Sequence, residues 1–144
     1  MPDVATSILL NSDGKILILK RSDKVKTYKG QWGGVAGYVE KNEKPFDTAI
    51  KEIFEEVGLM KEDVKLIKKL DPIFITDYYE QEKYEWKIFV FLFKTKKESK
   101  IRIDWEHSEY RWITPSEIIN YNTVPHLKDV IKKLIIEDNE EGEN

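Results

Sequence analysis

Three glutamates at helical spacing constrain this chain more than any other feature of its sequence. Glu52, Glu55 and Glu56 occupy positions i, i+3 and i+4, which places their carboxylates on one helical face, one turn apart. The opposite stripe is apolar and would anchor the helix in a core; its members are Phe46, Ala49, Ile50, Ile53 and Val57. The pattern therefore predicts a helix over residues 46–57 that is buried on one side and acidic on the other.

An acidic helix face of this kind has two interpretations. Acidic runs on solvated faces are common, although like charges one turn apart destabilise an isolated helix slightly. A rigid helix that presents clustered carboxylates also suits Mg²⁺ or Mn²⁺, which prefer hard oxygen ligands. The three residues alone favour the solvated face, so the decision depends on the segment before the helix.

Composition excludes several classes of site. With 144 residues, of which 40% are hydrophobic and 12% aromatic, the chain fits one globular domain over residues 1–144. We expect residues 137–144 to form a flexible acidic tail. A net charge of −3 with interspersed signs gives no signature of nucleic-acid binding. The absence of cysteine excludes a thiol nucleophile and a thiolate zinc site, and two histidines argue against a histidine metal site.

No apolar run approaches membrane-spanning length, and the amino terminus lacks a signal-peptide pattern. We therefore expect a cytoplasmic protein with no membrane partner.

Hydrophobic alternation and turn residues predict the remaining elements. A turn at residues 11–14 separates two strands, residues 4–10 and 15–20. A glycine-rich extended segment at residues 32–40 precedes the acidic helix. After that helix we expect an interrupted strand at 64–76, a polar loop at 77–83, a buried strand at 84–95, a short strand at 110–113 and a helix at 125–136. The fold class is therefore α+β, with a mixed central sheet flanked by helices.

The segment from 37 to 59 resembles the Nudix box, a family motif written G-x5-E-x7-R-E-U-x-E-E-x-G-U, in which U is apolar. The matching residues are Gly37, Glu43, Glu52, Ile53, Glu55, Glu56, Gly58 and Leu59. Lys51 stands where the family has arginine. The positive charge is kept, but the planar guanidinium, which can form bidentate hydrogen bonds with a carboxylate, is lost. We expect Lys51 to contact Glu43 or a helix carboxylate, with some loss of rigidity.

The resemblance implies an α/β/α sandwich that hydrolyses a diphosphate linked to another group, commonly in a nucleoside diphosphate derivative. Mg²⁺ or Mn²⁺ would neutralise the diphosphate, orient its oxygens and activate a water. The resemblance assigns Glu55 and Glu56 as main metal ligands and Glu52 as a third ligand or general base. It adds the Ala36 carbonyl as a further ligand.

Other residues have supporting or less specific assignments. By the same resemblance, Gly37, Glu43 and Lys51 would support the metal ligands. Many relatives carry an acidic residue, either a metal ligand or a base, in the loop before a late strand. Glu106 and Glu109 lie there, and Glu106 is our catalytic candidate, although an ordinary polar loop fits both residues equally. We expect the intervening His107 at the surface.

Substrate contacts are assigned more broadly. Aromatic side chains could stack on a nucleobase, and we expect one such contact from the set Trp32, Tyr78, Tyr79, Tyr84 and Trp86. Within this set, Trp32 and Tyr78 are our candidates for substrate binding, and core packing is the alternative role for each. Arg21 and Lys29, in the loop before Trp32, could meet phosphates, although solvated surface charges are the more common interpretation of such residues.

The expected partner is a small-molecule nucleotide such as a nucleoside triphosphate, an ADP-ribose-like sugar nucleotide or a dinucleoside polyphosphate. The alternative is a Nudix-fold binding or sensor module that has lost catalysis; only Lys51 favours it, and the intact glutamate set argues against it. Isopentenyl diphosphate isomerase shares the fold but depends on cysteine, which is absent. RNA decapping would need an RNA-binding region that we do not find. Family members are often dimers, so a homodimer remains open.

Overall fold

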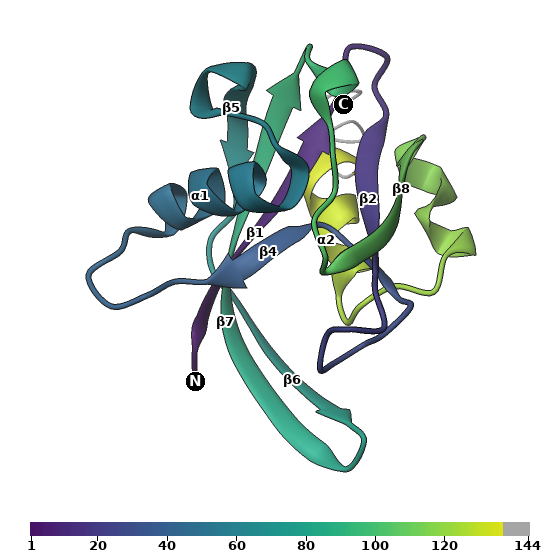
Figure 1. Ribbon diagram of the computed structural model, residues 1–144. Coiled ribbons are helices and arrows are strands. Elements are labelled where there is room, and N and C mark those ends of the chain that lie inside the picture. The colour runs from purple at the N-terminus through teal and green to yellow at the C-terminus, as the bar shows by residue number, and fades with distance from the viewer. Residues whose placement is uncertain (137–144) are drawn as a thin grey trace, which may run out of the picture.

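The computed structural model describes residues 1–136 and shows one mixed sheet with helices against both faces (Figure 1). Its strands are β1 (Asp3–Leu10), β2 (Ile16–Arg21), β3 (Trp32–Gly33), β4 (Val35–Tyr38), β5 (Val64–Lys69), β6 (Ile73–Tyr79), β7 (Glu82–Thr95) and β8 (His107–Ile113). The helices are α1 (Pro45–Val57), α2 (Leu127–Ile131), the 3₁₀ turns Lys61–Asp63, Glu98–Lys100 and Pro115–Asn120, and a π-helical turn, Lys132–Ile136.

Strand β1 organises the sheet. It pairs in parallel with β7 over the register Asp3↔Lys87 to Leu10↔Lys94. On its other edge it pairs antiparallel with β2 near the connecting turn and with β4 further along. The backbone path runs β3-β2-β1-β7-β5, while β6 pairs with β7 and β8 with β2. This arrangement places β4, which leads into α1, at the middle of the sheet.

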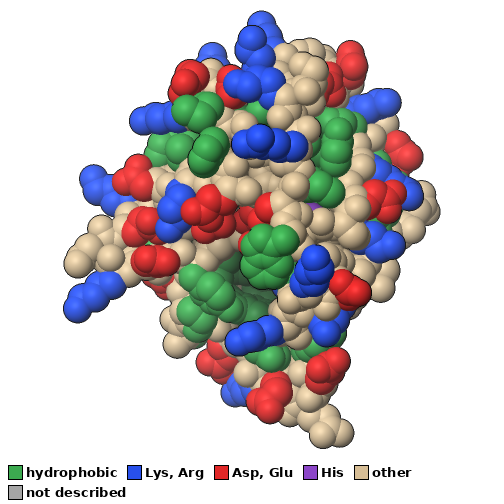
Figure 2. Space-filling model, viewed as in Figure 1, with side chains coloured by type: hydrophobic (Ala, Val, Ile, Leu, Met, Phe, Trp, Pro, Cys, Tyr) green, Lys and Arg blue, Asp and Glu red, His purple; other side chains and the backbone are tan. Residues whose placement is uncertain are grey.

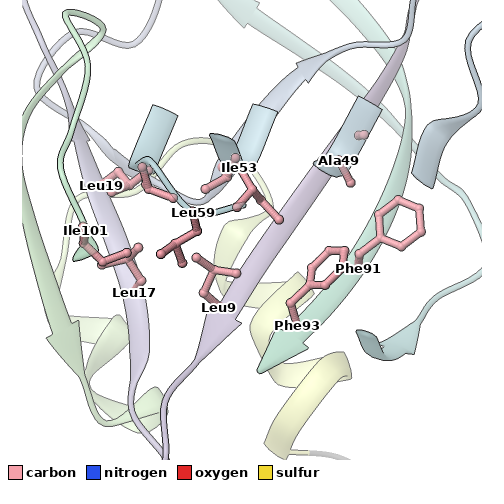
Figure 3. Close-up of a cluster of buried hydrophobic side chains, with 12 residues drawn as sticks. Leu9, Leu17, Leu19, Ala49, Ile53, Leu59, Phe91, Phe93 and Ile101 are labelled. Atoms are coloured by element: carbon pink, nitrogen blue, oxygen red, sulfur yellow. The ribbon is translucent and has the colours of Figure 1, made fainter. Parts of the chain in front are cut away.

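Alternation along the central strands divides the core into two layers. On β1, Ala5 and Leu9 pack toward α1, whereas Ile8 packs toward α2. Figure 3 shows the α1 layer, in which Ala49 and Ile53 of the helix meet apolar side chains of the sheet. The second layer joins the opposite sheet face to Leu127, Val130 and Ile131 of α2. A sheet covered on both faces is an α/β/α sandwich, so the predicted fold class is confirmed.

Helix α1 begins and ends as its sequence suggests. Pro45 occupies the first turn, where its missing N–H costs nothing. Gly58 ends the helix in the left-handed region, with φ of 79°, and its N–H donates to the Phe54 carbonyl at 3.0 Å. With these boundaries, the face of α1 that carries Glu52 lies over β4.

Two expected boundaries are wrong. The polar loop expected at residues 77–83 is a tight hairpin: β6 continues to Tyr79 and β7 begins at Glu82. Glu80 and Gln81 form its turn with φ of 49° and 69°, a conformation usually signalled by Asn or Gly and therefore not visible in this sequence. The strand expected at residues 110–113 begins at His107. The tail at residues 137–144 lies outside the described residues.

No helix among residues 1–136 is long and apolar enough to cross a lipid bilayer.

Candidate active site

A cavity of about 420 Å³ opens between β4, α1, the loop after β2 and the β6–β7 hairpin. Its acidic end consists of Glu52, Glu55 and Glu106, whose charges act on one another, beside the backbone of Gly37. Its apolar end consists of two groups of neighbours: Tyr28 with Ile75 and Trp86, and Ile88 with Leu127 and Val130. Figure 2 shows acidic side chains gathered near the middle of this face, beside hydrophobic groups around a hollow. The cavity can therefore receive a ligand with one charged and one apolar part.

Gly37 lets α1 approach β4 closely enough to put Glu52 in the cavity. A Cβ atom at position 37 would overlap the Glu52 carboxylate, because the side chain crosses directly over the strand. Ala36 and Gly37 pair with Thr6 and Ala5 of β1, so this stretch of backbone is held on its sheet side. The glycine is thus required by the close approach of a side chain.

Glu52 and Glu56 form a hydrogen-bonded carboxyl pair. Burial raises the pKa of Glu56 well above its usual range, and the neighbouring charge of Glu52 raises it further. Burial also raises the pKa of Glu52, although the hydrogen bond from Glu56 opposes that rise. Burial and the neighbouring carboxylate thus favour the protonated form of Glu56.

Glu56 is the most enclosed of the three glutamates, with only 2% of its surface exposed. Its Oε2 atom is buried without a hydrogen-bond partner, and its Oε1 atom lies 3.6 Å from His107 Nε2. On the other side of the imidazole, Nδ1 lies 2.8 Å from Asp104 Oδ1. Burial lowers the pKa of His107, so the ring beside Glu56 is neutral.

The expectation that His107 lies at the surface is wrong. Its side chain is buried because β8 pairs with β2 in the register Arg21↔His107, which turns the ring toward α1. Nothing local in the sequence signals this position.

Glu43 ties the loop before α1 to the helix. Lys51 Nζ donates to both of its oxygens, at 3.0 and 3.2 Å, and the Thr48 hydroxyl donates to Oε1. These hydrogen bonds, that of Thr48 first, lower the pKa of Glu43. The contact expected between Lys51 and Glu43 is therefore present, and it lies behind the face that carries Glu52.

Of the two later acidic candidates, the structure brings Glu106 to the cavity and leaves Glu109 outside it. Burial raises the pKa of Glu106, as does the nearby Asp104, while Arg21 acts in the opposite direction. Glu109 pairs instead with Arg111, whose Nη2 lies 2.8 Å from Oε1. Arg21 also lines the cavity, and its positive charge acts on Glu106.

Trp32 and Tyr78 do not line the cavity. Trp32 is buried, and its ring packs edge-on against Tyr121 at 5.4 Å with the Arg111 guanidinium 5.1 Å from its centre. Tyr78 is 69% exposed, because alternation along β6 turns it to the outer face of the hairpin. The aromatic side chains at the cavity are Tyr28, Tyr38 and Trp86, of which only Trp86 belongs to the set considered from the sequence.

A divalent cation suits the acidic end on chemical grounds. The candidate donors are carboxylates, and one buried carboxylate oxygen, Oε2 of Glu56, has no partner. Within residues 1–136, however, no three acidic or imidazole side chains already converge on one point as metal ligands do.

Comparison with known proteins identifies the family. The model of the NUDIX domain matches residues 1–134. The chain belongs to the NUDIX family. As a NUDIX hydrolase it acts on nucleoside diphosphate derivatives, which agrees with the resemblance of residues 37–59 to the family motif.

Individual relatives are more distant. The nucleoside triphosphatase NudI of Escherichia coli O139:H28 is 26% identical over 117 residues, which cover 79% of this chain and 83% of that protein. Among solved structures, a C. elegans Ap4A hydrolase in a binary complex has a TM-score of 0.75 at 17% identity, covering 93% of this chain and 95% of the other. The MutT protein of Methanosarcina mazei Go1 has a TM-score of 0.74 at 22% identity, covering 95% and 94%. These structural likenesses establish the fold.

Proposed function

We propose that this NUDIX hydrolase cleaves a pyrophosphate bond of a nucleoside triphosphate in a reaction that requires Mg²⁺ or Mn²⁺. The observation that carries the proposal is the division of one cavity into a carboxylate-lined end and an aromatic, apolar end. A nucleotide has the matching division, because its phosphates need cations while its base is flat and largely apolar on its faces. The polarity of the cavity would thus orient the substrate.

In this proposal Glu52, Glu55 and Glu56 hold the cation, together with the exposed backbone of Ala36. The cation, when bound, would neutralise phosphate oxygens and lower the pKa of a water. To bind the cation, Glu56 must be ionised, although burial raises the pKa of this carboxyl. The ion pair between Glu43 and Lys51 supports these ligands by fixing the start of α1.

Glu106 and Arg21 complete the phosphate end. Glu106 is half-buried, and its raised pKa makes it a better proton acceptor than an ordinary surface glutamate. We assign it as a general-base candidate beside Glu52. The Arg21 guanidinium lines the same end and would pair with a phosphate oxygen of the substrate.

The choice of a nucleoside triphosphate has two supports. NudI, a relative found by sequence, is named as a nucleoside triphosphatase. A cavity of about 420 Å³ also suits one nucleoside better than the two of a dinucleoside polyphosphate such as Ap4A. ADP-ribose-like compounds are the next substrates to test.

The second candidate function is a nucleotide-binding module without catalysis. One observation favours it: the carboxylates of residues 1–136 are not already arranged around a cation position. Such a module would bind nucleotide with little dependence on Mg²⁺ and would not turn it over.

Product analysis separates the two functions. The protein is incubated with nucleoside triphosphates, ADP-ribose and Ap4A, with Mg²⁺, with Mn²⁺ or with EDTA, and the products are resolved by ion-exchange chromatography. We expect cation-dependent release of a nucleoside monophosphate and pyrophosphate. Binding of these compounds without cation-dependent turnover would establish the module instead.

A further inference from the structure

The loop at residues 22–31 forms one wall of the cavity and is fastened at its base by Arg21. The Arg21 N–H donates to the Gln31 carbonyl at 2.9 Å, and the Gly30 N–H donates back to the Arg21 carbonyl at 2.9 Å. The Arg21 side chain reaches inside the loop, where Nε donates to the Thr27 carbonyl at 2.9 Å. The base of the loop is thus held by main-chain and guanidinium contacts, and Thr27 and Tyr28 face the cavity.

Tyr28 fastens the far side of this loop to the β6–β7 hairpin. Its hydroxyl donates to Asp77 Oδ2 at 2.6 Å, and its ring centre lies 4.5 Å from that of Tyr79 and 6.3 Å from that of Trp86. The side chain is buried, with 7% of the residue exposed. Asp77, Tyr79 and Trp86 belong to the face of the hairpin opposite to the exposed Tyr78.

The backbone of Tyr28 is held in a conformation that a bulky residue rarely adopts. Its φ is 53°, in the left-handed region, where the side chain crowds the following carbonyl. Such a conformation persists only where surrounding contacts hold it in place. Here the Gln31 N–H donates to the Tyr28 carbonyl at 3.1 Å from within the loop, and the side chain is held by Asp77, Tyr79 and Trp86 of the hairpin.

We propose that Tyr28 and Asp77 form a clamp that sets the width of the apolar end of the cavity and so positions the base of the substrate. Tyr28 comes from the loop, while Ile75 and Trp86, which line the same end, come from the hairpin. The clamp links these two walls directly. This inference rests on the proposed function, because it assumes that a nucleobase occupies the apolar end.

The clamp also determines how a base is recognised. The Tyr28 hydroxyl already donates its hydrogen bond to Asp77. A base in the cavity therefore meets the ring of Tyr28 and not its hydroxyl. The aliphatic side chains opposite, such as Ile88, Leu127 and Val130, offer no hydrogen bonds. A base is therefore held by packing, and a wider cavity weakens binding of every base. Because the clamp acts on the apolar end of the cavity, we expect its effect to fall on KM and to leave the chemical step unchanged.

Variants of the clamp test the inference. Tyr28→Phe and Asp77→Ala each remove the hydrogen bond, whereas Asp77→Asn keeps an acceptor for the phenol; Tyr110→Phe, an exposed tyrosine of β8, is the matched control. Substrates are a nucleoside triphosphate and ribose 5-triphosphate, which lacks the base. We expect Tyr28→Phe and Asp77→Ala to raise KM for the nucleotide about two- to tenfold, the range for one lost hydrogen bond, with kcat and base-free hydrolysis unchanged. Asp77→Asn should rescue most of the effect.

Limited proteolysis gives a readout independent of turnover. The loop carries the exposed residues Lys24, Lys26 and Lys29, so trypsin should cut it faster in Tyr28→Phe and Asp77→Ala than in wild type or Tyr110→Phe. An unchanged cutting rate and an unchanged KM would overturn the clamp. Equal losses on the nucleotide and the base-free substrate would also overturn it, because they indicate general loosening.

The design separates failure of the clamp from failure of the proposed reaction. If wild type hydrolyses nothing, the enzymatic function fails, and calorimetric affinity for the same nucleotide replaces KM in the comparison of variants. If wild type neither hydrolyses nor binds nucleotide, both proposals are overturned.

Discussion

Glu52 and Glu56 share a hydrogen bond across one turn of α1, and that bond requires one proton on the pair. Glu56 is the more deeply buried partner; burial and the charge of Glu52 raise its pKa, and its Oε2 atom has no hydrogen-bond partner. A divalent cation would replace this proton, since a cation satisfies both carboxylates at once. The pair therefore links protonation, cation binding and stability at one position, and the first two predictions follow from this link.

Glu56→Gln should abolish activity without unfolding the protein. The amide has the shape of a protonated carboxyl and can keep the hydrogen bond to Glu52, but it cannot supply a charged ligand. We expect kcat/KM to fall roughly 100-fold or more, because the cation contributes several kcal/mol of charge stabilisation. Steady-state kinetics at saturating Mg²⁺ measure the loss, and circular dichroism checks the fold.

Glu62→Gln is the control for this variant, since Glu62 is an exposed glutamate just after α1. Full activity in Glu56→Gln would remove Glu56 from the cation site.

The same carboxyl should make the cation-free protein less stable as the pH rises. Its pKa in the folded state lies above the usual 4.5, so its contribution to the free energy of unfolding is full below about pH 4.5. The contribution is lost as the pH rises through the raised pKa, where a buried charge must form. In EDTA, the urea midpoint of wild type should therefore fall relative to that of Glu56→Gln as the pH increases toward neutrality and above.

Adding Mg²⁺ to wild type should reduce this difference, because the cation stabilises the ionised carboxylate and binds the folded state. Other titrating groups are common to both proteins, so the difference between the two curves isolates Glu56. Curves that stay parallel from acid to alkaline pH would contradict the raised pKa.

The glutamates of α1 could be predicted from the sequence because their geometry is local. Spacing within one helix places Glu52, Glu55 and Glu56 on one face, and the adjoining segment contains Gly37. His107 and Tyr28 could not be predicted in the same way. His107 reaches Glu56 through the pairing of β8 with β2, and Tyr28 reaches Asp77 across 49 positions of sequence. Contacts of this length leave no periodic pattern in the chain.

The fold was predictable to a similar degree. The turn at residues 11–14, the strands on either side of it and the acidic helix all carry local signals, and the structure contains each of them. The hairpin turn at Glu80 and Gln81 carries none, because neither residue favours a positive φ. Strand pairing imposes that turn, and it thereby positions Trp86 at the cavity and Asp77 beside Tyr28.

Gly37→Ala should reduce activity more than stability. The added methyl group would occupy the space of the Glu52 carboxylate, which must rotate away from the cavity. A displacement of about 1 Å in a catalytic group can cost on the order of 100-fold in rate, so we expect a loss of that size at saturating Mg²⁺. Kinetics and thermal melting are measured together.

Gly14→Ala provides the contrast for this variant. Gly14 has φ of 75° in the hairpin turn after β1 and has open space around it, so alanine there adds strain away from the cavity. It should lower the melting temperature and leave kcat/KM unchanged. If Gly37→Ala behaves like Gly14→Ala, Glu52 has no part in the reaction.

Lys51 tests whether the departure from the family arginine costs activity. Lys51→Met removes both hydrogen bonds to Glu43, so the pKa of Glu43 should rise toward its usual value and the loop before α1 should loosen. Supporting groups of this kind typically change activity or metal affinity about 10- to 100-fold, and we expect a rise of that order in the Mg²⁺ concentration needed for half-maximal rate. Lys51→Arg restores the bidentate guanidinium, and its activity should match or exceed that of wild type.

Lys41→Met, at an exposed lysine in the same loop, is the control for lost charge. Wild-type Mg²⁺ dependence in Lys51→Met would show that the pair contributes nothing to the site, whereas impaired activity in Lys51→Arg would show that the surroundings of Glu43 have adapted to lysine.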